Sequence, residues 1–460
     1  MKDKLIGSVQ LLLLVFCVSP VIFGQEEVSS PGIEAVLTQV SQRLTLRDYN
    51  GALELFNSLP AEQANVVEIR LMRASILNAA GKPAEAKQIA NAVVASDSRN
   101  TDALMILADS AALENKERER RQFLERVIGI NQNHARALTD LANINLGNQN
   151  LRVAGNYFDR ALAAEPDNGE ALVGRASVHR YNKEARSAER LLNRAVTLYP
   201  DWARPLQERG RLYKGAGLNA DALDDFTAAL SLEPDNYWIL VDHGQLLMEI
   251  NRYEDALVSL NRAIRVSPNV FMAYVYSAAI KDQMGDYAGA ERDYIMLGRL
   301  KPDYYFAFEA LGVIRMRNKQ WALARDAFLD AYRNAPKEFS YAILASLNWM
   351  RAGRPADPKQ FLSQVLRTAP RDSLDYAVLR LLHDLRGDSD VIRKIEAEQN
   401  IYTKSRMLFY LATYFDIQGS RTLADRYHLM VQELAAVASI EWQLNDIALA
   451  ERGGNLRNPQ

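Results

Sequence analysis

The sequence has few of the residues that most often carry chemistry. Its 460 residues include one cysteine, Cys17, and five histidines that lie far apart along the chain. A single thiol cannot form an internal disulfide or supply a set of zinc ligands. The sequence also has no Gly-x-x-x-x-Gly-Lys-Ser/Thr, His-Glu-x-x-His or Gly-x-Ser-x-Gly motif. We therefore expect no catalytic residues, no metal site and no cofactor, and we predict that the protein is not an enzyme.

Neither sign of charge dominates the sequence. It has 55 Lys and Arg residues against 57 Asp and Glu residues, so its formal net charge is -2 at pH 7. A chain with this balance has no overall attraction for the phosphates of a nucleic acid. We therefore expect no nucleic-acid partner.

The sequence also lacks an apolar run long enough to span a bilayer comfortably, and we expect no transmembrane helix. Its N-terminal apolar run covers residues 11–18 and follows Lys2 and Lys4. After Pro20, Ile22 and Phe23 precede Gly24. A basic start followed by a short apolar core is typical of an export signal. We expect residues 1–24 to be a signal peptide that is cleaved after Gly24.

The place of Cys17 inside this segment allows two interpretations. If the signal is cleaved after Gly24, the mature chain contains no cysteine. Alternatively, Cys17 carries a lipid as in a bacterial lipoprotein, although the bulky Phe16 precedes it. The sequence contains no Asn-x-Ser/Thr acceptor, which favours a bacterial cell envelope over a eukaryotic secretory route. We expect a periplasmic or envelope-associated protein, which includes a protein bound peripherally to a membrane of the envelope.

A spacing of 34 residues organises most of the chain. It relates four alanines, four closing prolines, four small residues and four large apolar residues. These are Ala222, Ala256, Ala290 and Ala324; Pro234, Pro268, Pro302 and Pro336; Gly210, Gly244, Ala278 and Gly312; and Phe226, Leu260, Tyr294 and Phe328. The pattern resembles an array of tetratricopeptide repeats (TPRs), whose 34-residue helix-turn-helix unit has small residues at helix crossings and a closing proline. The resemblance implies an all-α, right-handed superhelical solenoid.

The same spacing predicts how the chain is divided. We expect a flexible leader at 25–32, about twelve repeats at 33–438, a capping helix at 439–452 and a loose tail at 453–460. The repeats at 135–338 are the most regular, whereas the repeat at 373–404 is two residues short and degenerate. A helical repeat array needs a cap because its last repeat would otherwise expose an apolar face.

In TPR proteins the first helices of successive repeats line a concave groove. By resemblance, the positions that face it are the second, fifth, sixth, ninth, twelfth and thirteenth of each repeat. Applied to the seventh to ninth repeats, this predicts an apolar surface that we call the groove patch: Trp238, Val241, Met248, Met272, Tyr276, Phe306, Val313 and Met316. Large apolar groups on a solvent-facing surface commonly mark interaction sites. The alternative is that neighbouring helices bury these residues as ordinary packing.

The fifth and sixth repeats present cations at the corresponding positions, and we call these the basic patch: Arg180, Arg204, Arg211 and Lys214. They resemble the clamp with which some chaperone-binding TPR proteins hold a carboxylate, which predicts an anion site. The asparagines of that clamp are absent, however. The alternative is a solvated face on which Glu170 and Glu208 neutralise the cations.

Together these features predict a scaffold or adaptor that holds a protein or peptide in the TPR groove. Because an aromatic surface also stacks on sugars, a second hypothesis is a component of a polysaccharide export or cell-wall assembly machine. Neither the partner nor the oligomeric state follows from the sequence.

Overall fold

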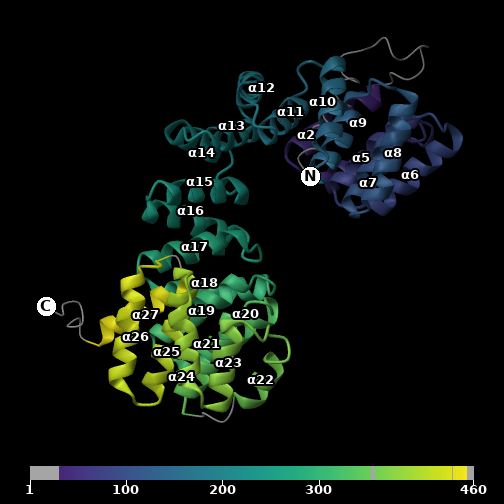
Figure 1. Cartoon of the computed structure of the whole chain (residues 1–460). Coiled ribbons are helices and arrows are strands. Elements are labelled where there is room, and N and C mark those ends of the chain that lie inside the picture. The colour runs from purple at the N-terminus through teal and green to yellow at the C-terminus, as the bar shows by residue number, and fades with distance from the viewer. Residues whose placement is uncertain (1–30, 354–357, 438, 453–460) are drawn as a thin grey trace. The chain divides into compact units, whose positions relative to one another are not determined.

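The computed structural model describes residues 31–353, 358–437 and 439–452 (Figure 1). These residues form α-helices and one short 3-10 helix, with no strand among them. The predicted signal peptide, Cys17 and the predicted tail lie outside the described residues. The described chain divides into two compact units between Leu232 and Glu233, and each is described by itself.

The N-terminal unit contains repeats 1 to 6, and most repeats are one antiparallel pair of helices, which we call helix A and helix B. Its helices are α2 (Pro31–Thr45), α3 (Tyr49–Leu55), α4 (Ala61–Ala64), α5 (Val67–Ala79), α6 (Pro83–Ser96), α7 (Thr101–Leu113), α8 (Glu117–Ile130), α9 (Ala135–Gly147), α10 (Leu151–Ala164), α11 (Gly169–Tyr181), α12 (Ala185–Leu198), α13 (Ala203–Gly215) and α14 (Asn219–Leu232). Repeat 1 is irregular, because α3 ends in a 3-10 turn at Phe56–Ser58. Helix α2 begins at Pro31, so the end of the predicted leader is already helical.

The C-terminal unit contains repeats 7 to 12 and the capping helix. Its helices are α15 (Tyr237–Glu249), α16 (Tyr253–Val266), α17 (Met272–Gln283), α18 (Tyr287–Leu300), α19 (Tyr305–Arg317), α20 (Trp321–Asn334), α21 (Phe339–Arg351), α22 (Lys359–Val365), α23 (Leu374–Asp384), α24 (Asp388–Ala397), α25 (Ile401–Ile417), α26 (Arg421–Leu434) and α27 (Ile440–Glu451). The short repeat 11 has a visible consequence: α25 begins at Ile401, four residues before the position that the 34-residue spacing predicts. The last helix, α27, lies within residues 439–452, the range for which the sequence predicts a capping helix.

The repeated small and large residues pack on each other inside each repeat. A Cβ atom added to Gly312 in helix A would lie 2.5 Å from the ring of Phe328 in helix B, and one added to Gly210 would lie 2.7 Å from Phe226. Gly244 has the same relation to Leu260. The missing side chain therefore lets a large apolar residue of helix B reach the backbone of helix A, which explains why the two slots recur together.

The turn from helix A to helix B needs a left-handed residue at the fifteenth position of each of the twelve repeats. Six of these residues are glycines, with φ between 76° and 88°: Gly81, Gly217, Gly285, Gly353, Gly387 and Gly419. The other six have side chains and φ between 57° and 61°: Arg47, Asn115, Gln149, Lys183, Asn251 and Lys319. A left-handed conformation costs an L-residue about 1–2 kcal/mol, so the fold imposes it even where the sequence does not favour it.

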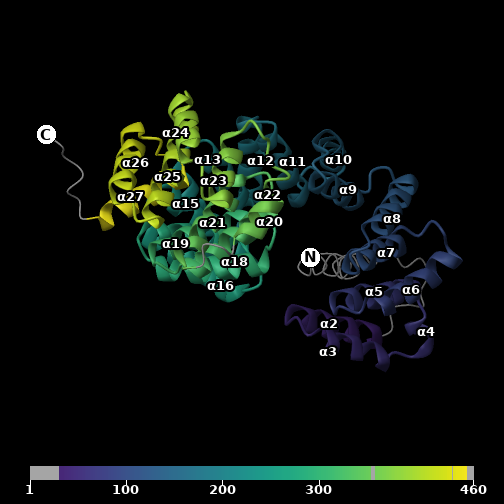
Figure 2. The same ribbon diagram turned by 60° about the horizontal axis from the view of Figure 1, so that its bottom comes forward.

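The last helix closes the C-terminal unit on itself. Helix α27 packs beside α25 and α26, as both views show (Figures 1 and 2), and it also contacts α19. One continuous apolar core accordingly extends from Met316 in α19 to Leu444 in α27. The capping helix therefore joins repeats that are far apart in the sequence.

Candidate partner-binding site

The groove patch lies on the A helices of repeats 7, 8 and 9, which are α15, α17 and α19, all in the C-terminal unit. Its two most accessible members are Trp238, which is 53% exposed, and Phe306, which is 49% exposed. Four further members are half-buried: Met248, Met272, Tyr276 and Val313. The remaining two are buried, with Val241 4% exposed and Met316 6% exposed, and Met316 belongs to the apolar core. The accessible part of the patch is therefore smaller than the sequence predicts.

Local contacts fix the two exposed rings. The side chain of Asn236 caps α15 by accepting a hydrogen bond from the backbone N–H of Trp238 at 3.0 Å. The Trp238 ring meets the edge of Tyr237, with ring centroids 5.1 Å apart. The Tyr237 hydroxyl in turn accepts a hydrogen bond from the N–H of Ala273 at 3.0 Å, which ties α17 to α15. Trp238 is thus held at a defined position.

Phe306 lies in a second group of aromatic rings. Its centroid is 4.2 Å from that of Tyr305 and 5.6 Å from that of Tyr304. Tyr305 packs against the apolar core of the C-terminal unit. The exposed ring therefore lies against two half-buried tyrosine rings and needs little reordering to contact a partner.

The surroundings of the patch are acidic. The pKa of the Tyr276 hydroxyl is raised by burial and by the nearby carboxylates of Glu249 and Asp242. Burial also raises the pKa of Asp282, although Arg317 opposes the shift. Partly buried carboxylates beside aromatic rings favour a cationic group on a partner, because charge and ring face both attract it.

The basic patch lies on α11 and α13, in the N-terminal unit, where carboxylates of the same chain already engage it. Glu208 accepts from Arg211 at 2.6 Å and from Arg180 at 3.4 Å, and Glu170 accepts from Arg204. Burial acts to raise the pKa of Glu208, but these three arginines outweigh burial and lower it. Lys214 also has an interaction partner. These contacts agree with the neutralised face that the sequence left open, and the anion site stays a prediction.

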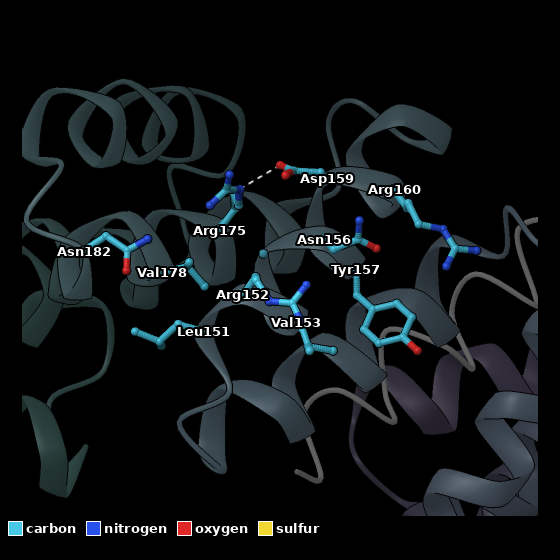
Figure 3. A pocket seen from close by; sticks show the side chains of 11 residues that line it. Leu151, Arg152, Val153, Asn156, Tyr157, Asp159, Arg160, Arg175, Val178 and Asn182 are labelled. Atoms are coloured by element: carbon cyan, nitrogen blue, oxygen red, sulfur yellow. Dashed lines mark hydrogen bonds and ion pairs between the residues drawn. The ribbon is translucent and has the colours of Figure 1, made fainter.

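A cavity of about 830 Å³ lies between α10 and α11 (Figure 3). Gly155 lies in its lining, where a Cβ would be 3.3 Å from a guanidinium nitrogen of Arg175. Figure 3 shows Arg175 reaching across to Asp159, with 2.7 Å between donor and acceptor. A second lining cation, Arg160, donates to the carbonyl of Gln132 at 2.9 Å. Two of the three arginines that line this open cavity are thus engaged within the chain, and the third is Arg152.

The histidines hold local structure. His428 is fully buried and pairs with Asn445, His243 contacts Ser259, and His134 accepts from the N–H of Ala137 at the start of α9. In the described part of the chain, no group of three or more His, Cys, Asp or Glu residues could hold a metal ion. None of the described helices has the length and apolarity needed to cross a membrane.

The fold and its site define a helical repeat protein whose repeats are antiparallel helix pairs. Family profiles described as tetratricopeptide repeat match residues 139–201 and 214–278. The chain belongs to the TPR family, as its 34-residue period predicts. Members of this family mediate contacts between proteins and are generally not enzymes, so the chain is a protein-interaction scaffold.

Several solved structures of TPR proteins are similar to this chain. PilW, described as a widely conserved type IV pilus biogenesis factor, is 17% identical, with a TM-score of 0.41 over 46% of this chain and 98% of its own. PilF of Pseudomonas aeruginosa is 20% identical, with a TM-score of 0.39 over 45% and 95%. A tetratricopeptide repeat protein from Parabacteroides merdae is 16% identical, with a TM-score of 0.36 over 55% and 98%. A comparison with curated protein sequences finds no match.

The sequence prediction of the groove considered only its large apolar members and missed its carboxylates. Asp242, Glu249, Asp282 and Glu309 occupy the same groove positions in repeats 7 to 9, against one cation, Arg317. The six-position pattern that selected Trp238 would have found them as well. The acidic character of the site was therefore readable from the sequence.

Proposed function

We propose that this chain is a non-enzymatic scaffold that holds an extended segment of a protein partner along α15, α17 and α19. The observation that carries the proposal is the exposure of Trp238 and Phe306 at the second position of α15 and α19. The repeat fold does not need a large apolar group there, whereas buried aromatic anchors dominate many protein interfaces.

The charges beside these rings indicate what the segment carries. Four carboxylates and one cation occupy the groove positions of repeats 7 to 9, and two of the carboxylates raise the pKa of Tyr276. A segment with an apolar side chain flanked by lysine or arginine complements this surface. The apolar group would lie against Trp238 or Phe306, and the cations would approach Asp242 and Glu249.

We further propose that the scaffold acts in a bacterial cell envelope. The support is the basic and apolar N-terminal segment, which is typical of an export signal, and the absence of glycosylation acceptors. A fusion of residues 1–30 to a reporter that is active only outside the cytoplasm tests export. Activity in the wild-type fusion and its loss when Leu12 and Leu13 become arginine are the expected results.

The binding proposal is tested by site-directed photo-crosslinking in cells. A photoreactive phenylalanine analogue replaces Phe306 in one variant and Val258 in another. Val258 is a suitable control because it is 69% exposed but lies on the B helix α16. We expect a partner to be crosslinked from position 306 and not from position 258.

The affinity of that partner is then measured for two double variants. Removing both anchors in Trp238→Ala/Phe306→Ala should weaken binding at least tenfold, since one interface anchor typically contributes about 1–4 kcal/mol. Val258→Ala/Leu323→Ala removes equally exposed apolar groups from B helices and should leave binding unchanged. Equal affinities for all three proteins would refute the proposal. Retention of a glycan in place of a protein would support the polysaccharide hypothesis instead.

A further inference from the structure

A second cavity lies in the C-terminal unit, where the capping helix meets the array. It is open to solvent, has a volume of about 680 Å³, and is lined by the ends of α19, α21, α25 and α27 and the starts of α20 and α26. This volume falls within the range of about 300–1,000 Å³ that is usual for small-molecule sites. The cavity exists because α27 turns back to contact α19.

Positive charge is in surplus around this cavity. Five of its lining side chains are cations, namely Arg317, Lys319, Arg351, Arg421 and Arg452. Two are carboxylates, Asp416 and Glu451, which leaves a surplus of three positive charges. Counting Asp425, which bonds Arg452, and Asp282, which interacts with Arg317, still leaves a surplus of one. The whole chain, by contrast, has a net charge of -2.

Two of these cations are desolvated and share one carboxylate. The side chains of Arg351 and Arg452 are 16% and 13% exposed, and both bond Asp416, which is 3.3 Å from Arg351. Burial lowers the pKa of Arg351, Asp416 opposes the shift, and the positive charge of Arg452 adds to it. Arg351 also lies over the ring of Trp321, 4.8 Å from its centroid. The guanidinium is therefore held in place, and Asp416 and Glu451 only partly offset the effect of its burial.

The rest of the lining is apolar. Met350 and Leu444 are each 3% exposed and Met316 is 6% exposed, while Trp321 and Ile447 are half-buried. A small inorganic anion would leave this wall in contact with water. A ligand with an anionic head and an apolar body would satisfy both parts of the lining.

We propose that the cavity under α27 binds a small amphiphilic anion, a molecule that joins a carboxylate or phosphate head to an apolar body. The head lies among Arg351, Arg421 and Arg452, and the body lies against the methionines and Leu444. Because α27 supplies one wall, the ligand stabilises the contact between the capping helix and α19. This site is separate from the exposed rings of the groove patch.

The test uses a series of eight-carbon probes on the whole chain: octanoate, octyl phosphate, 1-octanol and octylamine. Binding is measured by calorimetry, and protection of α27 is measured by hydrogen exchange. We expect both anions to bind and to slow exchange in α27, and the relative affinities of octanoate and octyl phosphate identify the preferred head. Octanol should bind at least tenfold more weakly, and octylamine should not bind.

Three variants make the assignment specific. Arg421→Gln removes a cation that bonds no carboxylate among the described residues, so it should weaken anion binding at least fivefold without affecting the fold. Ala448→Phe fills the cavity from α27 without changing charge and should abolish binding of every probe. Arg265→Gln, an exposed cation of α16, is the control and should have no effect. Equal binding of octanol and the anions, or unchanged binding in both cavity variants, would overturn the proposal, as would failure of both anions to bind at millimolar concentration.

Discussion

The hydroxyl of Tyr410 in α25 donates a hydrogen bond to the carboxylate of Glu441 in α27, and both side chains are buried, at 1% and 3% exposure. Burial raises the pKa of Glu441, while the bond from Tyr410 and the charge of Arg406 oppose the shift. The capping helix is thus fastened to the last repeat by a polar contact inside the core.

This contact predicts that Glu441→Gln is tolerated and Glu441→Ala is not. The amide oxygen of glutamine still accepts the Tyr410 hydrogen bond and carries no charge to desolvate. Alanine leaves the buried hydroxyl without a partner, which costs about 1–3 kcal/mol.

Because the pKa of Glu441 is raised in the folded state, that state binds its proton more tightly than the unfolded chain does. The wild type therefore loses stability as pH rises above the ordinary glutamate pKa, and Glu441→Gln does not. We expect the advantage of Glu441→Gln to be larger at pH 8 than at pH 5. Urea unfolding, followed by hydrogen exchange in α25 and α27, measures the stability of both variants and its dependence on pH. If the stability of Glu441→Gln relative to the wild type fell as pH rose, the raised pKa of Glu441 would be wrong.

A second prediction concerns acid. Burial lowers the pKa of His428 to about 4, while the hydrogen bond that its Nδ1–H donates to the side-chain oxygen of Asn445 acts in the opposite direction. The unfolded chain takes up this proton near pH 6.5 and the folded chain only near pH 4, so stability falls as pH drops through this interval. The loss approaches about 3 kcal/mol for this one group. Between pH 6.5 and pH 4.5, the urea concentration at the midpoint of unfolding should fall less in His428→Gln than in the wild type. An equal fall in the two proteins would contradict this prediction.

The left-handed turns give a third prediction. Lys183 has φ of 61° and is exposed, so its side chain contributes strain and no packing. Lys183→Gly should stabilise the turn between α11 and α12 by about 0.5–1 kcal/mol. This is the strain energy that glycine relieves, reduced by the conformational entropy that glycine adds to the unfolded chain. The control is Arg190→Gly, an exposed position in the middle of α12, which should cost about 1 kcal/mol. Thermal unfolding compares the two, and a loss of stability in both would show that the turn is not strained.

The packing of a small residue of helix A against a large apolar residue of helix B gives a fourth prediction. Gly312→Ala places a methyl group 2.5 Å from the ring of Phe328, so the helices of repeat 9 must separate. Overpacking of this kind typically costs about 1–3 kcal/mol. In Gly129→Ala the new methyl group meets no atom within 4 Å, and the helix α8 should gain about 0.5–1 kcal/mol. If Gly312→Ala proved as harmless as Gly129→Ala, the packing that we assign to the repeat would be wrong.

The sequence alone determined the repeat. The contact of Gly312 with Phe328, like the closing prolines and the turns from helix A to helix B, lies within one repeat of about 34 residues. Such local features recur in every repeat, so they appear in the sequence as a period. The sequence also predicted the capping helix, since an array that ends without one exposes an apolar face. It placed Trp238 and Phe306 on an accessible surface, and the same six-position pattern contains the carboxylates around them.

Only the tertiary structure decided which of these surfaces stay accessible. Val241 and Met316 occupy groove positions but are buried, and Glu208 and Glu170 engage the cations of the basic patch. Repeats 10 to 12 depart from the regular pattern, and α27 packs on α19. The cavity beneath it brings Arg351 and Arg452 together although about three repeats separate them in the sequence. Its charge and its apolar wall depend on how helices far apart in the chain pack, and the pattern of a single repeat contains no information about that packing.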